Sequence, residues 1–141
     1  MFQRVLLAVD GSDDSQKAVD WAIGAYRQMP DTRFTVLHVC LPYVIPAGEG
    51  GVFYTYEQAE TNDPKETVAY QTWSRFPDRE RVNYLTVTGN PANEICEVAK
   101  DGAFDLIVLG SSGHGAVASV LLGSVSAKVL HRAPCSVLVV R

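Results

Sequence analysis

A glycine-rich segment holds the residues of this chain that are best suited to bind an anion. In residues 106–130, LIVLGSSGHGAVASVLLGSVSAKVL, an apolar run leads into Gly110, and Gly113, Gly115 and Gly123 follow. Glycine lets the backbone approach a ligand closely, and successive N–H groups in such a loop form a concave anion site. A helix that begins near Gly123 adds unpaired N–H groups and the positive end of its dipole. The alternative is that the glycines only shape a tight turn and a close contact between a helix and the sheet.

Hydroxyl groups accompany these glycines. The side chains of Ser111, Ser124 and Ser126 can donate to phosphate oxygens. After Asp105 the sequence has no Asp or Glu as far as Arg141. A carboxylate at about 4 Å repels a phosphate by about 1 kcal/mol even in water. The absence of acidic residues after Asp105 therefore predicts a polyanion site that is free of acidic groups.

Two common nucleotide-binding motifs do not fit these glycines. Gly110 and Gly115 have the separation of a Walker P-loop, but Ala116 and Val117 stand where it needs lysine and a hydroxyl residue. Residues 113–118, GHGAVA, match the dinucleotide fingerprint GxGxxG/A. That fingerprint belongs to the first strand of its fold and needs an acidic residue about 20 positions further on. Neither condition holds, so a nicotinamide dinucleotide is not expected.

Strands that alternate with helices must bring the candidate residues together. Continuous apolar runs predict strands buried on both faces, and amphipathic spacing predicts the helices between them. The expected strands are residues 5–9, 33–39, 82–89, 104–110 and 136–140. The expected helices begin after Ser12, at Asn90-Pro91 and at Ser124, and a further short helix is expected near residues 65–76. This alternation predicts an α/β fold with a parallel sheet.

Residues 40–64, CLPYVIPAGEGGVFYTYEQAETNDP, are assigned no regular structure. Loops of this length are uncommon in compact domains and are often functional. A surface excursion is the favoured interpretation, and a lid over a ligand is the alternative.

Composition narrows the class of protein. With 47% hydrophobic and 20% charged residues, the chain of 141 residues suits one globular domain. The net charge of −4 gives no reason to expect nucleic acid as a partner. The apolar run at 5–9 is too short for a signal peptide or a membrane span, so we expect a cytoplasmic protein without a membrane partner.

The three cysteines, Cys40, Cys96 and Cys135, are expected to be buried free thiols, with a reactive thiol as the alternative.

One further spacing fits the glycines: Gly, two residues, Gly, nine residues, Gly-Ser. Gly110, Gly113 and Gly123-Ser124 match it without slack. Here the sequence resembles the universal stress protein family, in the branch whose members bind ATP. Further pieces resemble the family in order: VLLAVDGS, VLHV, GNPANEI, DLIVLGSSGHG and LLGSVSAKVLHRAPCSVLVVR. The chain departs from the family after Val39, in the helix before Val82, and at Ser112, where an arginine is common.

The resemblance implies a Rossmann-like, three-layer fold of the adenine nucleotide α-hydrolase type. It has an open sheet of five parallel strands, in the order 3-2-1-4-5, with helices on both faces. Residues 1–141 are expected to form one such domain. Ligands bind such sheets at the carboxyl ends of the strands, where the strand order reverses. Asp10 and Gly110 end the two strands at that point.

Several residues near this crevice have a ligand role and a structural alternative. Asp10 can accept from a ribose hydroxyl or shape the turn before the first helix. Ala8 and Val39 can face the base or pack in the core. His114 can lie over the terminal phosphates or be solvated, and Val125 can contact the ligand or only begin the helix. The candidate site comprises Ala8, Asp10, Val39, Gly110, Ser111, Gly113, His114, Gly115, Gly123, Ser124, Val125 and Ser126.

The motifs favour binding over catalysis. We find no Walker lysine, arginine clamp or nucleophile–base pair, and no acidic metal ligand near the glycines, so no catalytic or metal-binding residue is assigned. The expected function is that of an ATP-binding regulatory protein of the stress response, with Mg²⁺ accompanying ATP and with AMP or ADP as alternative ligands. The alternatives are a slow ATPase or adenylyl-transfer enzyme, and an interaction module without nucleotide.

The last predicted strand gives an expectation for the oligomeric state. Residues 136–140 are apolar and lie at a sheet edge in the implied order. An uncovered edge favours pairing with another chain, and the resemblance implies a homodimer formed in this way. Coverage of the strand by a loop is the alternative.

Overall fold

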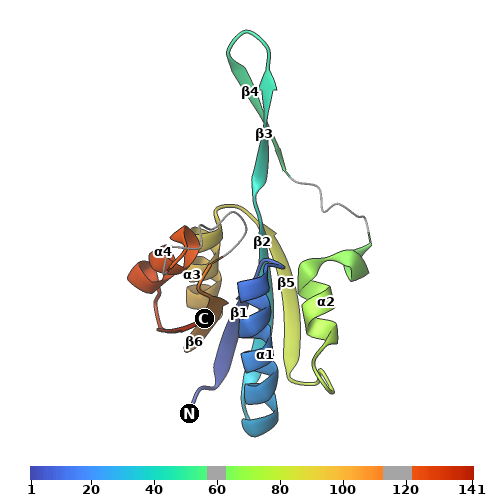
Figure 1. Ribbon diagram of the computed structural model, residues 1–141, viewed down its shortest axis with the longest axis vertical. Coiled ribbons are helices and arrows are strands. Elements are labelled where there is room, and N and C mark those ends of the chain that lie inside the picture. Colours follow the sequence, from blue (N-terminus) through green and yellow to red (C-terminus); the bar gives the residue numbers. More distant parts are fainter. Residues whose placement is uncertain (57–62, 113–121) are drawn as a thin grey trace.

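Five parallel strands form the centre of the protein (Figure 1). A computed structural model describes residues 1–56, 63–112 and 122–141. The strands of the main sheet are β1 (Arg4–Val9), β2 (Arg33–Cys40), β5 (Val82–Thr88), β6 (Leu106–Gly110) and β7 (Ser136–Val140). They lie in the order β5-β2-β1-β6-β7, and every neighbouring pair is parallel. This is the predicted order 3-2-1-4-5, so the fold class is confirmed.

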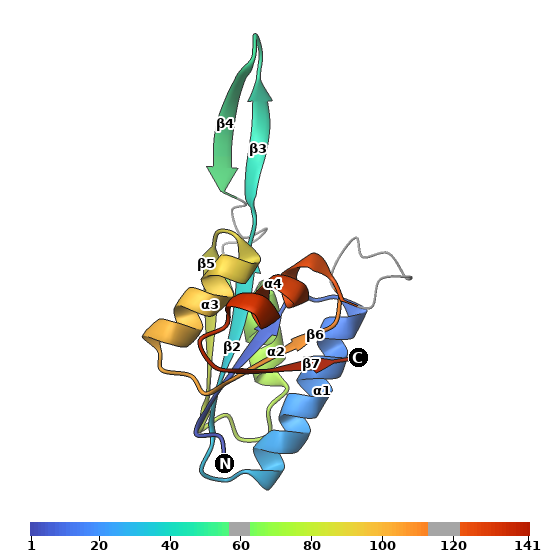
Figure 2. The ribbon, with the colours of Figure 1, turned by 90° about the vertical axis from the view of Figure 1, so that its left-hand side faces the viewer.

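Helices cover both faces of this sheet. They are α1 (Asp13–Gln28), α2 (Val68–Ser74), α3 (Pro91–Asp101) and α4 (Ser124–Arg132), with a short 3-10 helix, η1 (Pro64–Glu66), before α2. α1 and α2 pack on one face, and α3 and α4 pack on the other (Figure 2). In place of the single helix predicted near 65–76, the structure has two shorter elements, η1 and α2. They separate at Thr67, whose side chain accepts from the Tyr70 N–H at 3.2 Å and caps α2.

The predicted caps begin the longer helices. The Ser12 hydroxyl oxygen accepts from the Ser15 N–H at 3.3 Å and begins α1. The Asn90 side chain accepts from the Asn93 N–H at 3.2 Å, and Pro91 occupies the first turn of α3. Each cap satisfies a backbone donor that the first turn of a helix leaves unpaired.

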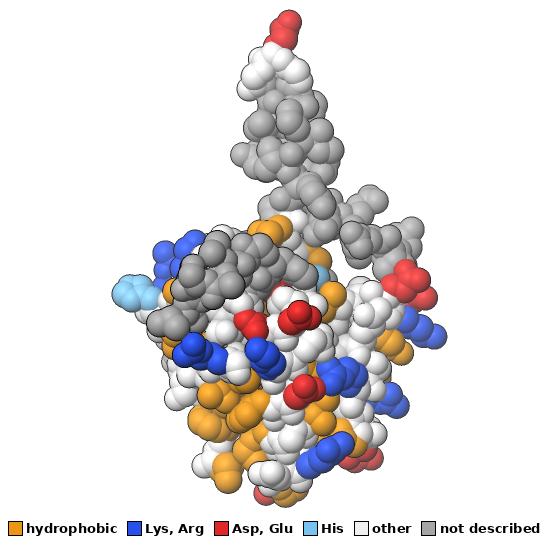
Figure 3. All heavy atoms as spheres, in the orientation of Figure 1, with side chains coloured by type: hydrophobic (Ala, Val, Ile, Leu, Met, Phe, Trp, Pro, Cys, Tyr) orange, Lys and Arg blue, Asp and Glu red, His pale blue; other side chains and the backbone are white. Residues whose placement is uncertain are grey.

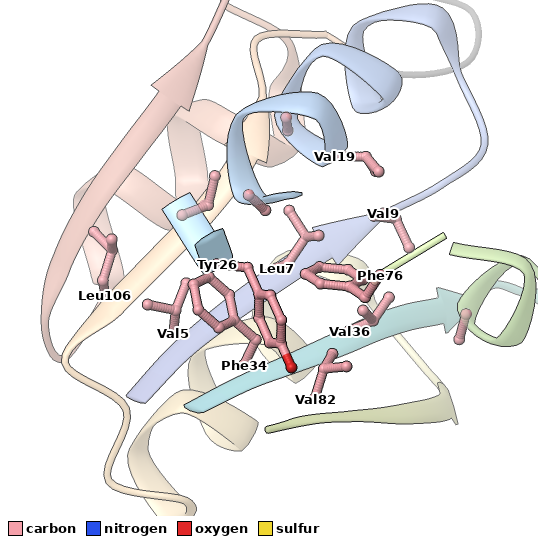
Figure 4. Packing of buried hydrophobic residues seen from close by; sticks show 14 residues of the cluster. Val5, Leu7, Val9, Val19, Tyr26, Phe34, Val36, Phe76, Val82 and Leu106 are labelled. Atoms are coloured by element: carbon pink, nitrogen blue, oxygen red, sulfur yellow. The ribbon is translucent and has the colours of Figure 1, made fainter. Parts of the chain in front are cut away.

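Two apolar clusters hold the layers together. Under α1 and α2, the rings of Tyr26, Phe34 and Phe76 lie with their centroids 5.3 to 6.1 Å apart (Figure 4). Under α3 and α4, the second cluster includes the fully buried Leu37 and Ile107. Because both faces of the central strands are covered, β1 is apolar from Val5 to Val9, as expected for a parallel sheet.

The segment after β2 differs from the sequence interpretation. β3 (Pro42–Ala47) and β4 (Gly51–Tyr56) form an antiparallel hairpin that projects beyond the sandwich (Figures 1 and 2). Its turn has positive φ at Glu49 (55°) and Gly50 (82°). The assignment of no regular structure to residues 40–64 is therefore wrong. The prolines at the ends of β3 hide the strand pattern, since proline is uncommon in strands except at edges.

The burial of the cysteines and the distribution of surface charge can be compared with the predictions from composition. Cys40 is buried, as predicted, whereas Cys96 and Cys135 are only half-buried, and none of the three is in a disulfide. Burial raises the pKa of Cys96 and of Cys135, which argues against the reactive-thiol alternative for these two. On the face in Figure 3, acidic and basic side chains are interspersed over the described residues. Within the described ranges, none of the helices combines the length and apolar character needed to cross a bilayer.

Candidate functional site

The carboxyl ends of β1 and β6 lie side by side at the centre of the sheet. The two strands pair in parallel, with Val5 opposite Leu106 and Leu7 opposite Val108. Continued along the two strands, this register places Asp10 and Gly110 at the same end of the sheet. The strand order reverses here, which is where ligands bind in open α/β sheets. The structure thus brings the two predicted strand-end residues together.

Asp10 shapes the turn between β1 and α1. Its Oδ1 accepts from the Ser12 N–H at 2.9 Å, and its own N–H donates to the Ser15 hydroxyl at 3.2 Å. Gly11, between them, has a φ of 81°, which glycine adopts without strain. The structural alternative for Asp10 is therefore present, and its contact with a ribose stays a prediction.

Gly110 allows α1 to lie directly against the end of β6. A Cβ on Gly110 would lie 2.6 Å from the carbonyl oxygen of Asp14 and 2.9 Å from the nitrogen of Ser15. Real Cβ atoms essentially never come so close to backbone atoms, so this position requires glycine for packing alone. The close contact between helix and sheet, weighed above as the alternative to an anion site, is thus real at Gly110.

Ser111 joins three elements at this point. It is buried, and its N–H donates to the Val140 carbonyl oxygen in β7 at 3.0 Å. Its carbonyl oxygen accepts from the Gly123 N–H at 2.6 Å and from the Ser126 hydroxyl at 2.9 Å. The Ser126 hydroxyl also lies 3.0 Å from the Gly123 carbonyl oxygen. Ser126 therefore ties the start of α4 to the end of β6, and in this conformation its hydroxyl is used within the protein.

Among the described residues, no side chain caps the first turn of α4 at the same place. Its N-cap is Gly123, which has no side chain to cap the helix, and the turn has no acidic residue. The first N–H groups of an α-helix have no partner within the helix, and they carry the positive end of the dipole. Ser124 is exposed and Val125 is half-buried. The arrangement can hold an anion beside Ser111.

A carboxylate that the sequence interpretation misses lies at this candidate anion site. Asp14, in the first turn of α1, accepts through Oδ2 from the hydroxyl of Ser111 at 3.3 Å and from the hydroxyl of Ser112. Its Oδ1 pairs with the Lys17 ammonium at 3.1 Å. These donors, Ser112 first, lower the pKa of Asp14, so this carboxylate is ionised at neutral pH. The prediction of a site free of acidic groups is therefore wrong.

Ala8 and Val39 lie in the apolar cluster under α3 and α4. Ala8 is buried, and Val39 is partly buried against the same cluster. Ala8 pairs with Leu37, and Val39 pairs with Val87 across β2 and β5. Core packing is therefore present for both residues, and contact with a base stays a prediction.

The remaining candidates are Gly113, His114 and Gly115, which fall outside the described residues. Among the residues that the structure describes, no group of three or more His, Cys, Asp or Glu side chains is placed to hold a metal ion. The candidate site that can be followed in space is thus built from Asp10, the end of β6 and the first turn of α4.

The fold and the site can be compared with known proteins. A sequence model of the universal stress protein family matches residues 1–141. The chain belongs to the universal stress protein family. It is 37% identical over 141 residues to a universal stress protein of Thermus aquaticus encoded in the QAH/OAS sulfhydrylase 3′ region, covering 100% of both chains.

Solved structures of universal stress proteins share the fold. UspA from Lactobacillus plantarum aligns with a TM-score of 0.76 and 24% identity, over 99% of this chain and 97% of that one. A universal stress protein in complex with cAMP aligns with a TM-score of 0.70 and 26% identity, again over 99% and 97% of the two chains.

Proposed function

We propose that this universal stress protein binds an adenine nucleotide, ATP first, with the phosphates between the end of β6 and the first turn of α4. One observation carries the proposal: the uncapped start of α4 is held against Ser111 by the 2.6 Å bond from the Gly123 N–H. Unpaired N–H groups and the helix dipole make this a favourable place for phosphate. The backbone at Gly113 and Gly115, with His114, would complete the phosphate contacts.

The rest of the nucleotide would extend toward β1 and β2. Asp10 is half-buried at the end of β1 and would accept from a ribose hydroxyl. Ala8 and Val39 would offer apolar surface to the base. Support for adenine comes from the universal stress protein in complex with cAMP, which shares 26% identity over 99% of this chain. AMP and ADP fit the same arrangement with fewer phosphates.

The proposed role is regulation by ligand binding, not turnover. Residues 1–141 would act as one cytoplasmic domain whose surface or assembly responds to the bound nucleotide in the stress response. Phosphoryl transfer requires positioned cations and a group that orients the attacking nucleophile. The ammonium of Lys17 pairs with Asp14 at 3.1 Å, so it neutralises a carboxylate of the protein first.

Nucleotide binding should be visible as a rise in thermal stability. ATP at about one hundred times its dissociation constant adds about 2.7 kcal/mol to the free energy of unfolding, which raises Tm by several degrees. Replacing Ser124 with Asp should abolish this rise. The new carboxylate would repel phosphate, yet it would favour the positive end of α4 and keep the Tm of the free protein unchanged or slightly higher.

Differential scanning fluorimetry and calorimetry with ATP, ADP, AMP and cAMP make this measurement. The matched control is Lys128→Ala, which changes charge on the same helix outside its first turn. If the unaltered protein shows no binding at millimolar nucleotide, or if Ser124→Asp binds as well as the unaltered protein, the proposed site is wrong.

We also propose a homodimer that forms through β7. This strand lies at the edge of the main sheet, and its residues Val137 to Val140 are half-buried. Pairing of two copies about a two-fold axis would cover the edge.

Replacing Leu138 with Lys should convert the dimer to a monomer, because it places a charge in this strand. Light scattering measures the mass, and circular dichroism shows whether the variant is folded. Leu130→Lys, at a position on α4 that is 45% exposed, is the control and should stay dimeric. A folded Leu138→Lys variant with unchanged dimer mass would refute this interface.

A further inference from the structure

The two hydroxyl groups that directly follow β6 both donate to a carboxylate of the protein. Ser111 and Ser112 follow directly after β6, and both of their hydroxyls donate to Oδ2 of Asp14. Asp14 comes from the first turn of α1, nearly one hundred residues earlier, as the separations of 97 and 98 show. The carboxylate therefore occupies donors that a phosphate oxygen would otherwise use.

The surroundings of Asp14 keep this negative charge in place. Oδ1 pairs with Lys17 at 3.1 Å, and the side chain of Asp14 is 23% exposed. The positive end of α1 further favours an anion in this turn. Asp13, its neighbour in the chain, is exposed and makes no such contact with the residues that the structure describes. Asp14 is thus a carboxylate whose charge is fixed beside the proposed phosphate site.

We propose that Asp14 makes this site select nucleotides by phosphate charge, so that a triphosphate binds chiefly as its complex with a divalent cation. This inference rests on the proposed function, because it concerns the same site. A free triphosphate brings several negative charges next to Asp14 and competes with it for the two serine hydroxyls. A bound Mg²⁺ neutralises part of that charge, and carboxylate and phosphate oxygens are the ligands that Mg²⁺ prefers.

The expected size of the effect follows from Coulomb's law. Repulsion between two unit charges about 4 Å apart weakens binding about fivefold at the dielectric constant of water, and more where water is partly excluded. The pairing of Lys17 with Asp14 reduces this repulsion without removing it, since Lys17 is 56% exposed. We therefore expect ATP to bind the unaltered protein about tenfold more weakly in EDTA than in Mg²⁺.

The test compares two isosteric variants of neighbouring carboxylates. Calorimetry gives the Kd of ATP in EDTA and in Mg²⁺ for the unaltered protein, Asp14→Asn and Asp13→Asn. Asp14→Asn should bind ATP about five- to tenfold more tightly in EDTA and lose most of its preference for Mg²⁺. Asp13→Asn removes the same formal charge from the same turn, yet it should keep the preference within about twofold because its side chain is solvated.

A further variant keeps the inference testable if Asp14→Asn does not fold. Lys17→Met removes an exposed cation and leaves Asp14 fully charged, so it should weaken ATP binding in EDTA and enlarge the preference for Mg²⁺. The inference is overturned if Asp14→Asn behaves like Asp13→Asn, or if it tightens binding equally with and without Mg²⁺. Failure of every protein to bind ATP under both conditions would instead overturn the proposed function.

Discussion

Replacing Gly110 with alanine is expected to lower the free energy of unfolding by about 2–3 kcal/mol. The added Cβ would lie 2.6 Å from the carbonyl oxygen of Asp14 and 2.9 Å from the nitrogen of Ser15. These are backbone atoms in the first turn of a helix, so no side-chain rotation can relieve the contact. Either α1 or the end of β6 must move, and buried strand neighbours such as Val108 hold β6 in place.

The same substitution should weaken nucleotide binding. A displaced α1 would carry the Asp10 turn and Asp14 away from the end of β6, since the Asp10 N–H is bonded to Ser15 at 3.2 Å. Urea denaturation measures the stability, and titration with ATP measures the affinity.

Gly24→Ala is the matched control for Gly110→Ala. Gly24 lies within α1, and a Cβ there would meet nothing within 4 Å. Because glycine costs about 0.5–1 kcal/mol relative to alanine inside a helix, this variant should be more stable than the unaltered protein. Equal stabilities for the two alanine variants would show that Gly110 is not needed for the contact with α1.

The elements that could be predicted from the sequence are those whose signals are local. Ser12 and Asn90-Pro91 mark the starts of α1 and α3 because a capping side chain acts on the next turn of its own helix. The apolar run at 5–9 predicts β1 because a central parallel strand has no solvent-facing side. The strand order, in contrast, was implied by the family resemblance and confirmed by the register.

The features that could not be predicted depend on contacts between distant segments. The approach of Asp14 to Ser111 and Ser112 joins α1 to the end of β6, and no spacing within residues 106–130 reveals it. The need for glycine at 110 has the same origin, because the clash would be with α1. For the hairpin, the local signal misleads, since Pro42 and Pro46 stand at positions of β3 that pair with Tyr56 and Val52.

Gly110 also shows why a glycine motif is weak support for a ligand on its own. Its packing role would explain the residue even if no phosphate bound there. The start of α4 is different. No described side chain caps its first turn and none in that turn is acidic, and the contact of Gly123 with Ser111 does not require either feature. The helix start is therefore the stronger indication of an anion site.

Away from the site, Arg81 joins the end of α1 to the start of β5. Its Nη1 donates to the carbonyl oxygens of Met29 at 3.0 Å and Thr32 at 2.6 Å, and its Nη2 donates to that of Tyr26 at 3.0 Å. The guanidinium also lies 3.9 Å from the centroid of the Tyr26 ring. Because the last carbonyls of a helix have no partner within it, one side chain caps α1 and binds the following turn to the start of β5.

Replacing Arg81 with methionine should therefore lower the free energy of unfolding by about 2–3 kcal/mol, since three hydrogen bonds from a charged donor to backbone carbonyls are lost. The stability of Arg81→Lys should lie between those of the unaltered protein and Arg81→Met, because an ammonium keeps the charge but cannot reach three carbonyls as a planar guanidinium does.

The control is Arg79→Met. The exposed Arg79 lies 5.0 Å from the Trp73 ring, a contact worth about 0.5–1 kcal/mol. Equal losses in urea denaturation for Arg81→Met and Arg79→Met would mean that the carbonyl contacts contribute nothing, and that α1 is held to β5 by apolar packing alone.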